Sequence, residues 1–369
     1  MNTLPWISHL CQGLKWSQVK TIGAIFTALI QCESAILNRI AEKMTHHTGV
    51  AVDHTLKRIQ RFLGNDKVDR KVVYANITRF VWRRIRHWKT VPIAMDWTIC
   101  ERREKWQILA ASVIVRGRGI PILLWAFPKN DFGKHLSQNH VEKAFLDELQ
   151  SLIGPCQRKK QTIVILADRG FARPALFEHI CSLGWHYVIR VKYNVSVSVD
   201  THTFMIGHIA LKHGEVREFK SVSYRSDGIV VIPRLVATRA NAAQEKKFDP
   251  WFLASSLPRQ ATTIVNLYSL RFTIEEDFRT MKTDLGFSDC RIRKLAHYRQ
   301  FLLLMALVLV FAFLVGLAAH RKPSLARHIT RRRAGKLDTS ISVVGIRLLR
   351  YSFDTLAYIS KIDKIPCPV

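Results

Sequence analysis

The sequence predicts a mixed α/β fold that follows a helical N-terminal region and is interrupted by a β-rich insertion. Three observations lead to this class. Residues 1–88 carry apolar residues at helical spacing, residues 91–195 switch between strand and helix patterns, and residues 196–260 hold short alternating strands. A meander of strands followed by helix, strand, helix and strand is typical of a sheet covered by helices.

The first segment, residues 1–88, is expected to be a helical DNA-binding domain. A long apolar pattern of helical period covers residues 20–44, and basic helical patterns follow at 55–66 and 72–88. A basic helix can lie on DNA. A charged face exposed to solvent explains each single helix equally well, so DNA binding by any one of them stays open.

The predicted α/β core begins with three strand patterns, VPIAMDWTI, WQILAASVIV and IPILLWAF, and RGRG joins the last two as a hairpin. A helix pattern, HVEKAFLDELQSLI, then leads into the strand QTIVILADRG, a helix over Pro174–Leu183 and the strand WHYVIRVK. We expect the core in two parts, residues 89–195 and 261–322, with residues 196–260 as the insertion between them.

One apolar segment allows a membrane hypothesis. Residues 301–319, FLLLMALVLVFAFLVGLAA, carry no charge and are long enough to span a bilayer. A helix that is apolar all round is also typical of the centre of a large soluble domain. Because a basic composition suited to DNA surrounds it, we expect a buried core helix and no membrane partner. The basic tail, residues 323–369, is expected to be weakly ordered.

Composition and cysteine usage narrow the class of protein. The chain has 369 residues, 48% of them hydrophobic, and a formal net charge of +29. Such a basic excess predicts a polyanionic partner, most simply nucleic acid, with a ribosome-like scaffold or an anionic lipid surface as alternatives. The seven cysteines contain no C-x-x-C pair, which favours reduced thiols over a zinc site or disulfides. Without a secretory pattern at residues 6–16, the expected location is the cytoplasm.

Residues 268–282, YSLRFTIEEDFRTMK, are predicted to lie on a single helix. At about 100° per residue, four polar side chains fall within an arc of roughly 60° beside an apolar stripe: Tyr268, Arg271, Glu275 and Lys282. Glu276 points about 100° away from this row, toward the solvent side. Glu275 is therefore the candidate acid.

Two further acids follow strand patterns. Asp96 ends the apolar run IAM, and Asp168 ends the run IVILA. Functional groups of α/β folds commonly lie at the carboxyl ends of strands, although a lone Asp there often only begins a turn. Three carboxylates without sulfur form a hard oxygen site suited to Mg²⁺ or Mn²⁺. Two ions would support in-line displacement at phosphorus, while Arg271, Lys282 and Tyr268 hold phosphate oxygens.

This constellation resembles the bacterial insertion-sequence transposases that carry a D-D-E triad on an RNase H-like core. The group is defined by a Tyr-x2-Arg-x3-Glu-x6-Lys signature, which Tyr268, Arg271, Glu275 and Lys282 match at every position. The surroundings MDWT and LADRGF also match those of the first two acids. The resemblance covers about residues 90–320 and implies that Asp96, Asp168 and Glu275 are catalytic and bind metal.

The resemblance implies further roles. Arg190 in YVIRVK looks like a DNA-contacting arginine, and Trp251 in DPWFLASSL looks like a tryptophan on which a flipped base stacks. A core-filling role explains Trp251 equally well. The family implies cleavage at both terminal inverted repeats by a homodimer acting in trans, and then strand transfer into target DNA. A bacterial protein of this kind is expected at the nucleoid.

Three other functions stay open at the level of sequence. A catalytically inactive DNA-binding relative would keep the basic surface without the reaction. A host nuclease or resolvase with the same core would cleave DNA without joining strands. An integral membrane protein anchored by residues 301–319 would partition into detergent.

Overall fold

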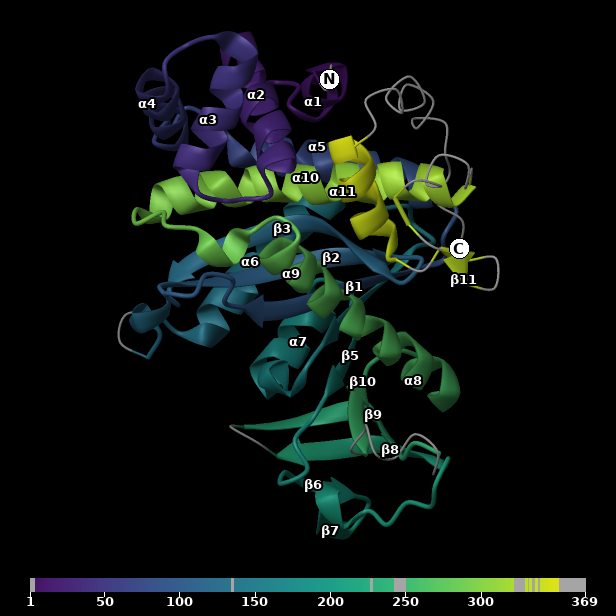
Figure 1. Cartoon of the computed structure of the whole chain (residues 1–369). Helices are drawn as coiled ribbons and strands as arrows, with labels where there is room; N and C mark the ends of the chain where they lie inside the picture. The colour runs from purple at the N-terminus through teal and green to yellow at the C-terminus, as the bar shows by residue number, and fades with distance from the viewer. Residues whose placement is uncertain are drawn as a thin grey trace.

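The computed structural model describes residues 4–133, 136–225, 228–241, 250–321, 329–330, 332–333, 336–337 and 339–351. Its helices and strands are arranged in three tiers (Figure 1). A helical N-terminal region lies above the long helix α10 (Leu295–Arg321), a mixed sheet lies beneath this helix, and the last strands of the sheet extend away from both. The mixed α/β class predicted from the sequence is confirmed.

The N-terminal region is helical, as predicted. Its five helices are α1 (Leu4–Leu10), α2 (Trp16–Cys32), α3 (Leu37–Thr48), α4 (Val52–Leu63) and α5 (Arg70–Ile85). The single long pattern at residues 20–44 is split, because Glu33 adopts a left-handed conformation with φ 52° that ends α2. The chain then turns by 104° into α3. Asp69 caps α5 by accepting hydrogen bonds from the backbone N–H groups of Lys71 and Val72.

One continuous sheet runs through the molecule in the order β3-β2-β1-β4-β5-β10-β9-β8-β6-β7. The core strands are β1 (Thr90–Thr98), β2 (Trp106–Val115), β3 (Arg118–Pro128), β4 (Thr162–Ala167) and β5 (His186–Arg190). The first three pair antiparallel, whereas β1 with β4 and β4 with β5 pair parallel. Arg116 (φ 50°) and Gly117 (φ 70°) form the two-residue turn of the predicted hairpin.

The strands expected as an insertion continue this sheet. They are β6 (Ser196–Val199), β7 (His202–Met205), β8 (Val216–Arg225), β9 (Ile229–Thr238) and β10 (Trp251–Ser255). β10 pairs antiparallel with β5 of the core on one side and with β9 on the other. The domain boundaries drawn from the sequence stay predictions.

Helices α6 (Gln138–Ile153) and α7 (Pro174–Ser182) connect β3 to β4 and β4 to β5, as the alternating pattern predicts. After β10 come α8 (Ala261–Ser269), a 3₁₀ turn over Leu270–Phe272 and α9 (Thr273–Thr283). The chain then enters α10, which packs along β3 and contacts α2, α4 and α5. This helix therefore joins the helical region to the sheet.

The apolar helix α10 is buried, as predicted. Among the described residues it is the one helix that is by itself long and apolar enough to cross a membrane, and its apolar window is completely covered by the rest of the protein. Part of that cover is α11 (Ile341–Tyr351), which lies across it (Figure 1). A Cβ added at Gly316 or Gly345 would meet a carbonyl oxygen of the other helix at 1.8 Å or 1.7 Å.

The expectation of a weakly ordered tail is therefore wrong for residues 341–351. Apolar residues of α11, among them Val344 and Leu348, are buried against the core, so the segment gains enough apolar contact to hold a helix. The rest of the tail, apart from residues 329–330, 332–333, 336–337 and 339–340, lies outside the described residues, as does Cys367. The six other cysteines are free thiols, in agreement with their spacing.

Candidate active site

The first two acids lie at the same end of neighbouring parallel strands. β1 and β4 pair with Ala94 opposite Leu166, so Asp96 and Asp168 each stand two residues beyond this pair. The side chain of Asp168 accepts a hydrogen bond from the backbone N–H of Gly170 at 2.8 Å and caps a short 3₁₀ turn. Asp96 accepts one from the backbone N–H of Trp97 at 2.8 Å. The predicted adjacency of these two strands is confirmed.

The third acid comes from a helix that differs from the predicted one. Residues 268–282 do not form a single α-helix, because the 3₁₀ turn over Leu270–Phe272 separates α8 from α9. The tighter turn changes the angular relation of residues before and after it. Tyr268 and Arg271 are consequently buried, with exposed fractions of 1% and 6%, whereas Glu275 in the first turn of α9 stays exposed.

Arg271 joins two of the three acids. Its guanidinium donates to Asp96 Oδ2 at 3.3 Å and to Glu275 Oε1 at 2.7 Å. The same guanidinium lies 4.6 Å from the centre of the Phe272 ring. Because a guanidinium has fixed, planar donors, these contacts hold the carboxylates of β1 and α9 on either side of one cation.

The electrostatics of Asp96 show that the three acids share one neighbourhood. The pKa of Asp96 is raised to about 7, mainly by burial and in smaller part by the charges of Asp168 and Glu275, against the lowering effects of Arg271 and of the hydrogen bond from Trp97. Burial lowers the pKa of the Arg271 guanidinium, but Tyr268 and the two carboxylates more than offset this and raise it overall. The site therefore concentrates negative charge that one arginine only partly neutralises.

The adjacent acid, Glu276, belongs to a different set of contacts. It pairs with Arg118 of β3 at 3.5 Å and with Arg279 one turn along α9. The next residue, Asp277, is 4% exposed and lies against Gly119, where an added Cβ would meet Asp277 Oδ2 at 2.0 Å. Burial raises the pKa of Asp277 well above its ordinary value. These contacts fasten α9 to the β2–β3 hairpin and leave Glu275 facing Asp96.

Tyr268 and Trp251 form an aromatic wall beside the acids. Their ring centres are 5.0 Å apart in an edge-to-face arrangement, and Phe272 lies 5.7 Å from Trp251. Burial raises the pKa of Tyr268, which the charges of Arg271 and Arg190 oppose, so its hydroxyl lies near both guanidinium groups. Arg190, at the end of β5, donates to the carbonyl oxygen of Pro250 at 3.3 Å.

Lys282 lies one helical turn beyond Phe278 on α9 and borders a shallow, open pocket of about 280 Å³. Asp96, Glu275 and Lys282 all line this pocket, together with Trp97, Thr98, Phe278, Arg279 and Thr283. Two of the acids and the lysine thus face one space. The lining combines carboxylate oxygens with cationic nitrogens, which is the chemistry that a metal ion and a phosphate group require together.

Whether a divalent metal fits here is decided by the donor set. Among the described residues, no three Asp, Glu, His or Cys side chains are arranged as a ready-made metal cluster. The chemistry of the donors nevertheless fits a hard cation, because the partly buried carboxylate of Asp96 has the carboxylates of Asp168 and Glu275 near enough to disfavour its ionisation. Arg271 occupies oxygens of Asp96 and Glu275 that such an ion would use.

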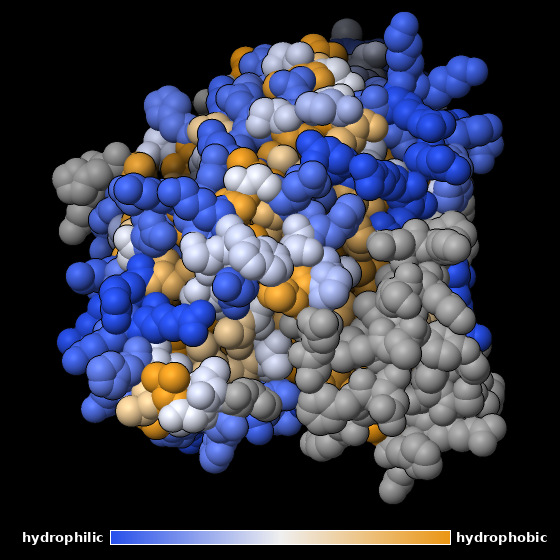
Figure 2. All heavy atoms as spheres, turned by 90° about the horizontal axis from the view of Figure 1, so that it is seen from above, coloured by the Kyte–Doolittle hydropathy of each residue, from blue (hydrophilic) through white to orange (hydrophobic). Residues whose placement is uncertain are grey.

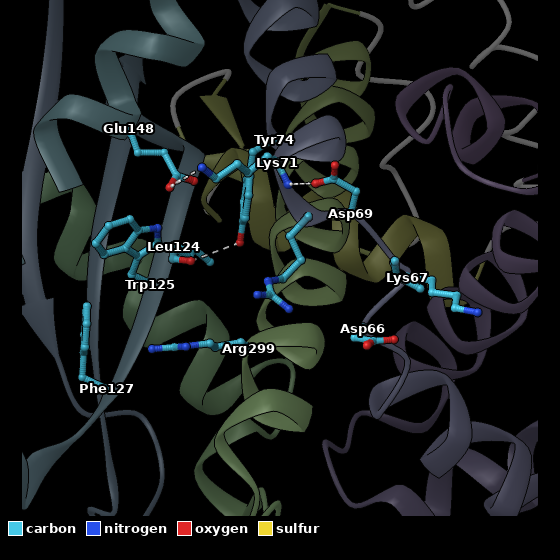
Figure 3. Close-up of a pocket in the computed structure, with 12 residues that line it drawn as sticks. Asp66, Lys67, Asp69, Lys71, Tyr74, Leu124, Trp125, Phe127, Glu148 and Arg299 are labelled. Carbon is cyan, nitrogen blue, oxygen red and sulfur yellow. Dashed lines mark hydrogen bonds and ion pairs between the residues drawn. The ribbon is translucent and has the colours of Figure 1, made fainter. Parts of the chain in front are cut away.

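A larger cavity of about 650 Å³ lies elsewhere, between the start of α5, the edge strand β3 and α10 (Figure 3). It shares no lining residue with the acidic pocket. Tyr74 donates to the carbonyl oxygen of Leu124 at 3.3 Å, and Arg299 donates to that of Ala126 at 2.9 Å. Lys71 pairs with Glu148 at 3.8 Å. Tyr74 and Arg299 thus satisfy carbonyl oxygens of the edge strand β3.

Sequence reasoning missed Asp277, Arg118 and Phe272. Asp277 stands three residues from Ile274 and so lies beside the buried face of α9, but an Asp at the edge of an apolar stripe is ordinarily exposed to solvent. Arg118 was interpreted only as a turn residue. Its pairing with α9 depends on the packing of β3 beside that helix, for which the sequence carries no local signal.

Part of the chain is similar to a known protein family. Residues 131–311 match the family model of the transposase DDE domain. The matched span includes Asp168, Glu275 and the Tyr, Arg and Lys of the predicted signature, and it begins after Asp96. No curated protein matches the chain.

Proposed function

We propose that this chain is an insertion-sequence transposase that cleaves DNA at terminal inverted repeats and transfers the strands into target DNA. The match to the transposase DDE domain implies transposase activity in general and a DNA substrate. The observation that carries the finer proposal is the shared charge neighbourhood of Asp96, Asp168 and Glu275 at the carboxyl ends of β1 and β4. We assign the catalytic and metal-binding roles to these three acids.

DDE transposase domains generally use divalent metal ions. We propose Mg²⁺ or Mn²⁺, two ions in all, held by the carboxylates of Asp96, Asp168 and Glu275. Bound there, the metal would supply Lewis acidity for in-line displacement at phosphorus. Asp96 must lose its proton first, because its pKa of about 7 leaves it partly protonated at neutral pH.

The neighbouring side chains position the DNA strand. Arg271, once released from Asp96 and Glu275, can grip a phosphate with two parallel hydrogen bonds. Lys282 adds a point charge at the mouth of the pocket. Tyr268 and Arg190 would donate to phosphate oxygens beside them. Trp251 packs edge-to-face on Tyr268, so a flipped base would have to stack on the ring face that this contact leaves uncovered.

The remaining features of the proposal concern the whole chain. We propose that β1–β5 with their helices are an RNase H-like core and that residues 196–260, which carry β6–β10, are its insertion. The net charge of +29 supports binding to long DNA. Seen from above, the molecule shows hydrophilic side chains with hydrophobic ones among them (Figure 2). We further propose a homodimer in the synaptic complex and a cytoplasmic, nucleoid-associated location.

The test uses the full-length chain and a duplex that carries the terminal repeats, identified as inverted repeats flanking the reading frame. Asp96→Asn and Asp168→Asn should each abolish metal-dependent strand cleavage and also the joining of pre-cut ends, while binding to the repeats persists. Cleavage without any joining by the unaltered protein would assign a nuclease instead. Repeat binding without either reaction in the unaltered protein would assign an inactive DNA-binding relative.

A further inference from the structure

A second charged surface lies at the opposite end of the strands that carry Asp96 and Asp168. It is built from the C-terminal part of α5 with the link into β1, and from the turn that leads into β4. Seven exposed cations belong to it: Arg79, Arg83, Arg86, Lys89, Arg158, Lys159 and Lys160. We refer to these seven residues as the basic edge.

Backbone and side-chain contacts bring the two halves of the basic edge together. The backbone N–H of Thr162 donates to the carbonyl oxygen of Lys89 at 2.8 Å, and Gln161 Nε2 donates to that of Ile85 at 3.0 Å. Arg79 and Arg83 lie close enough to Cys156 that both lower the pKa of its thiol, against the larger raising effect of burial. The cations therefore occupy one continuous surface.

Acidic residues are excluded from this region of the chain. Residues 70–95 and 149–167 contain no Asp or Glu. Asn76 of α5 also donates to the carbonyl oxygens of Leu10 and Gln12, which belong to a third acid-free stretch, residues 1–32. Among the described residues, no member of the basic edge takes part in an ion pair.

Stabilisation of α5 explains only part of this arrangement. Cations in the last turn of a helix interact favourably with its dipole, which accounts for Arg83. The dipole of α5 does not account for the triplet Arg158–Lys160 in the turn before β4. It also does not explain why residues 70–95 and 149–167 contain no Asp or Glu. Like charges crowded on one surface repel each other, and a polyanion relieves that repulsion.

We propose that the basic edge binds the phosphate backbone of duplex DNA, at a surface separate from the acidic pocket. The inference rests on the proposed function, which makes DNA the substrate. The surface favours duplex over single-stranded DNA because its aromatic residues are buried: Phe80, Trp82 and Trp88 are at most 8% exposed and offer no platform for unpaired bases. Contacts of this kind are independent of base sequence.

The experiment measures how binding to a random-sequence duplex varies with salt, by fluorescence anisotropy in EDTA. The full-length triple variant Arg83→Gln/Lys159→Gln/Lys160→Gln is compared with a control that removes the same charge from β8 and the turn before it, Lys212→Gln/Lys220→Gln/Arg225→Gln. All six residues are exposed. The slope of log K against log salt should flatten by about 0.9 for each lost contact, so close to three units for the first triple, and stay unchanged for the control.

Two further measurements serve as controls for the salt-dependence experiment. A charge-preserving triple, Arg83→Lys/Lys159→Arg/Lys160→Arg, should bind like the unaltered protein, which attributes the effect to charge instead of side-chain shape. The Gln triple of the basic edge should weaken binding to a single strand of equal length less than it weakens binding to the duplex. Equal flattening by both Gln triples, or no flattening by the first, would overturn the proposal. Because EDTA silences metal-dependent cleavage, the outcome is independent of whether Asp96, Asp168 and Glu275 are catalytic.

Discussion

The two ends of the parallel pair β1 and β4 differ sharply in chemistry. At their carboxyl ends, Asp96 and Asp168 stand at equivalent positions, and Arg271 joins Asp96 to Glu275. At their amino ends, Lys89 and the turn Arg158–Lys160 lie in segments of the chain that contain no acidic residue. A parallel pair places equivalent ends of both strands at one edge of the sheet, so residues near each strand end act together. If both proposals hold, one pair of strands separates the reaction site from a surface that only binds DNA.

The largest expected effect tests which acid of α9 acts together with Asp96 and Asp168. Glu275→Gln should lower the rate of metal-dependent cleavage by at least about 10³-fold, because it removes a charge placed at the reaction site. Glu276→Gln is the matched control, since this residue pairs with Arg118 and Arg279 instead. Single-turnover cleavage of a terminal-repeat duplex measures both. If Glu275→Gln keeps the cleavage rate of the unaltered protein and Glu276→Gln loses it, Glu276 is the catalytic acid instead.

The second prediction concerns Asp96 and pH. Its folded-state pKa of about 7 lies above the ordinary value of 3.8, so ionisation in the metal-free protein opposes folding. This acid contributes its full stability below about pH 4, and the contribution is lost as the pH rises through about 7. Asp96→Asn should therefore raise the free energy of unfolding at pH 8 by about 1–3 kcal/mol, and have little effect at pH 4.

Thermal or urea unfolding in EDTA at the two pH values measures this difference. If Asp96→Asn stabilises the protein equally at pH 4 and pH 8, the cause is a change in packing and not the loss of an ionisable group. In the same range, cleavage by the unaltered protein should increase with pH through about 7, because the reaction requires the ionised carboxylate. A cleavage rate that falls between pH 6 and 8 would contradict the assignment.

The third prediction asks what holds the acidic cluster together without metal. Arg271→Ala leaves Asp96 and Glu275 facing each other without the cation, and should destabilise the metal-free protein by about 1–3 kcal/mol. Adding Mn²⁺ should recover part of this loss, since an ion can then occupy both carboxylates. Unfolding with and without Mn²⁺ provides the measurement, and Arg279→Ala is the control on the exposed side of α9. If Mn²⁺ does not restore stability to Arg271→Ala, the metal does not bind at the carboxylates that the Arg271 guanidinium contacts.

The smallest effect is expected for Lys282. As a point charge at the pocket mouth, it should contribute about 0.9 units to the salt dependence of DNA binding. Lys282→Gln should remove this amount, and Lys220→Gln on β8 should not. The loss should be the same with and without the Gln triple of the basic edge, because distant sites contribute independently. Unequal losses would indicate that the two strand ends do not bind DNA separately.

Local pattern was sufficient for most of the secondary structure. The hairpin at Arg116–Gly117, the strands that end in Asp96 and Asp168, and the burial of residues 301–319 all follow from residue type and spacing. The break at Glu33 and the 3₁₀ turn before α9 could not be predicted, because neither contains Gly or Pro and each depends on how the flanking helices pack.

The residues around the acids also divide into features that local sequence predicts and features that packing decides. The order and spacing of Tyr268, Arg271, Glu275 and Lys282 were evident in the sequence, and so was the choice of Glu275 over Glu276 as a prediction. Only the folded chain buries Arg271 between Asp96 and Glu275, since those residues come from a strand and a helix distant in sequence. Spacing along a chain is a local property, whereas the partner of a buried charge is decided by which elements pack against it.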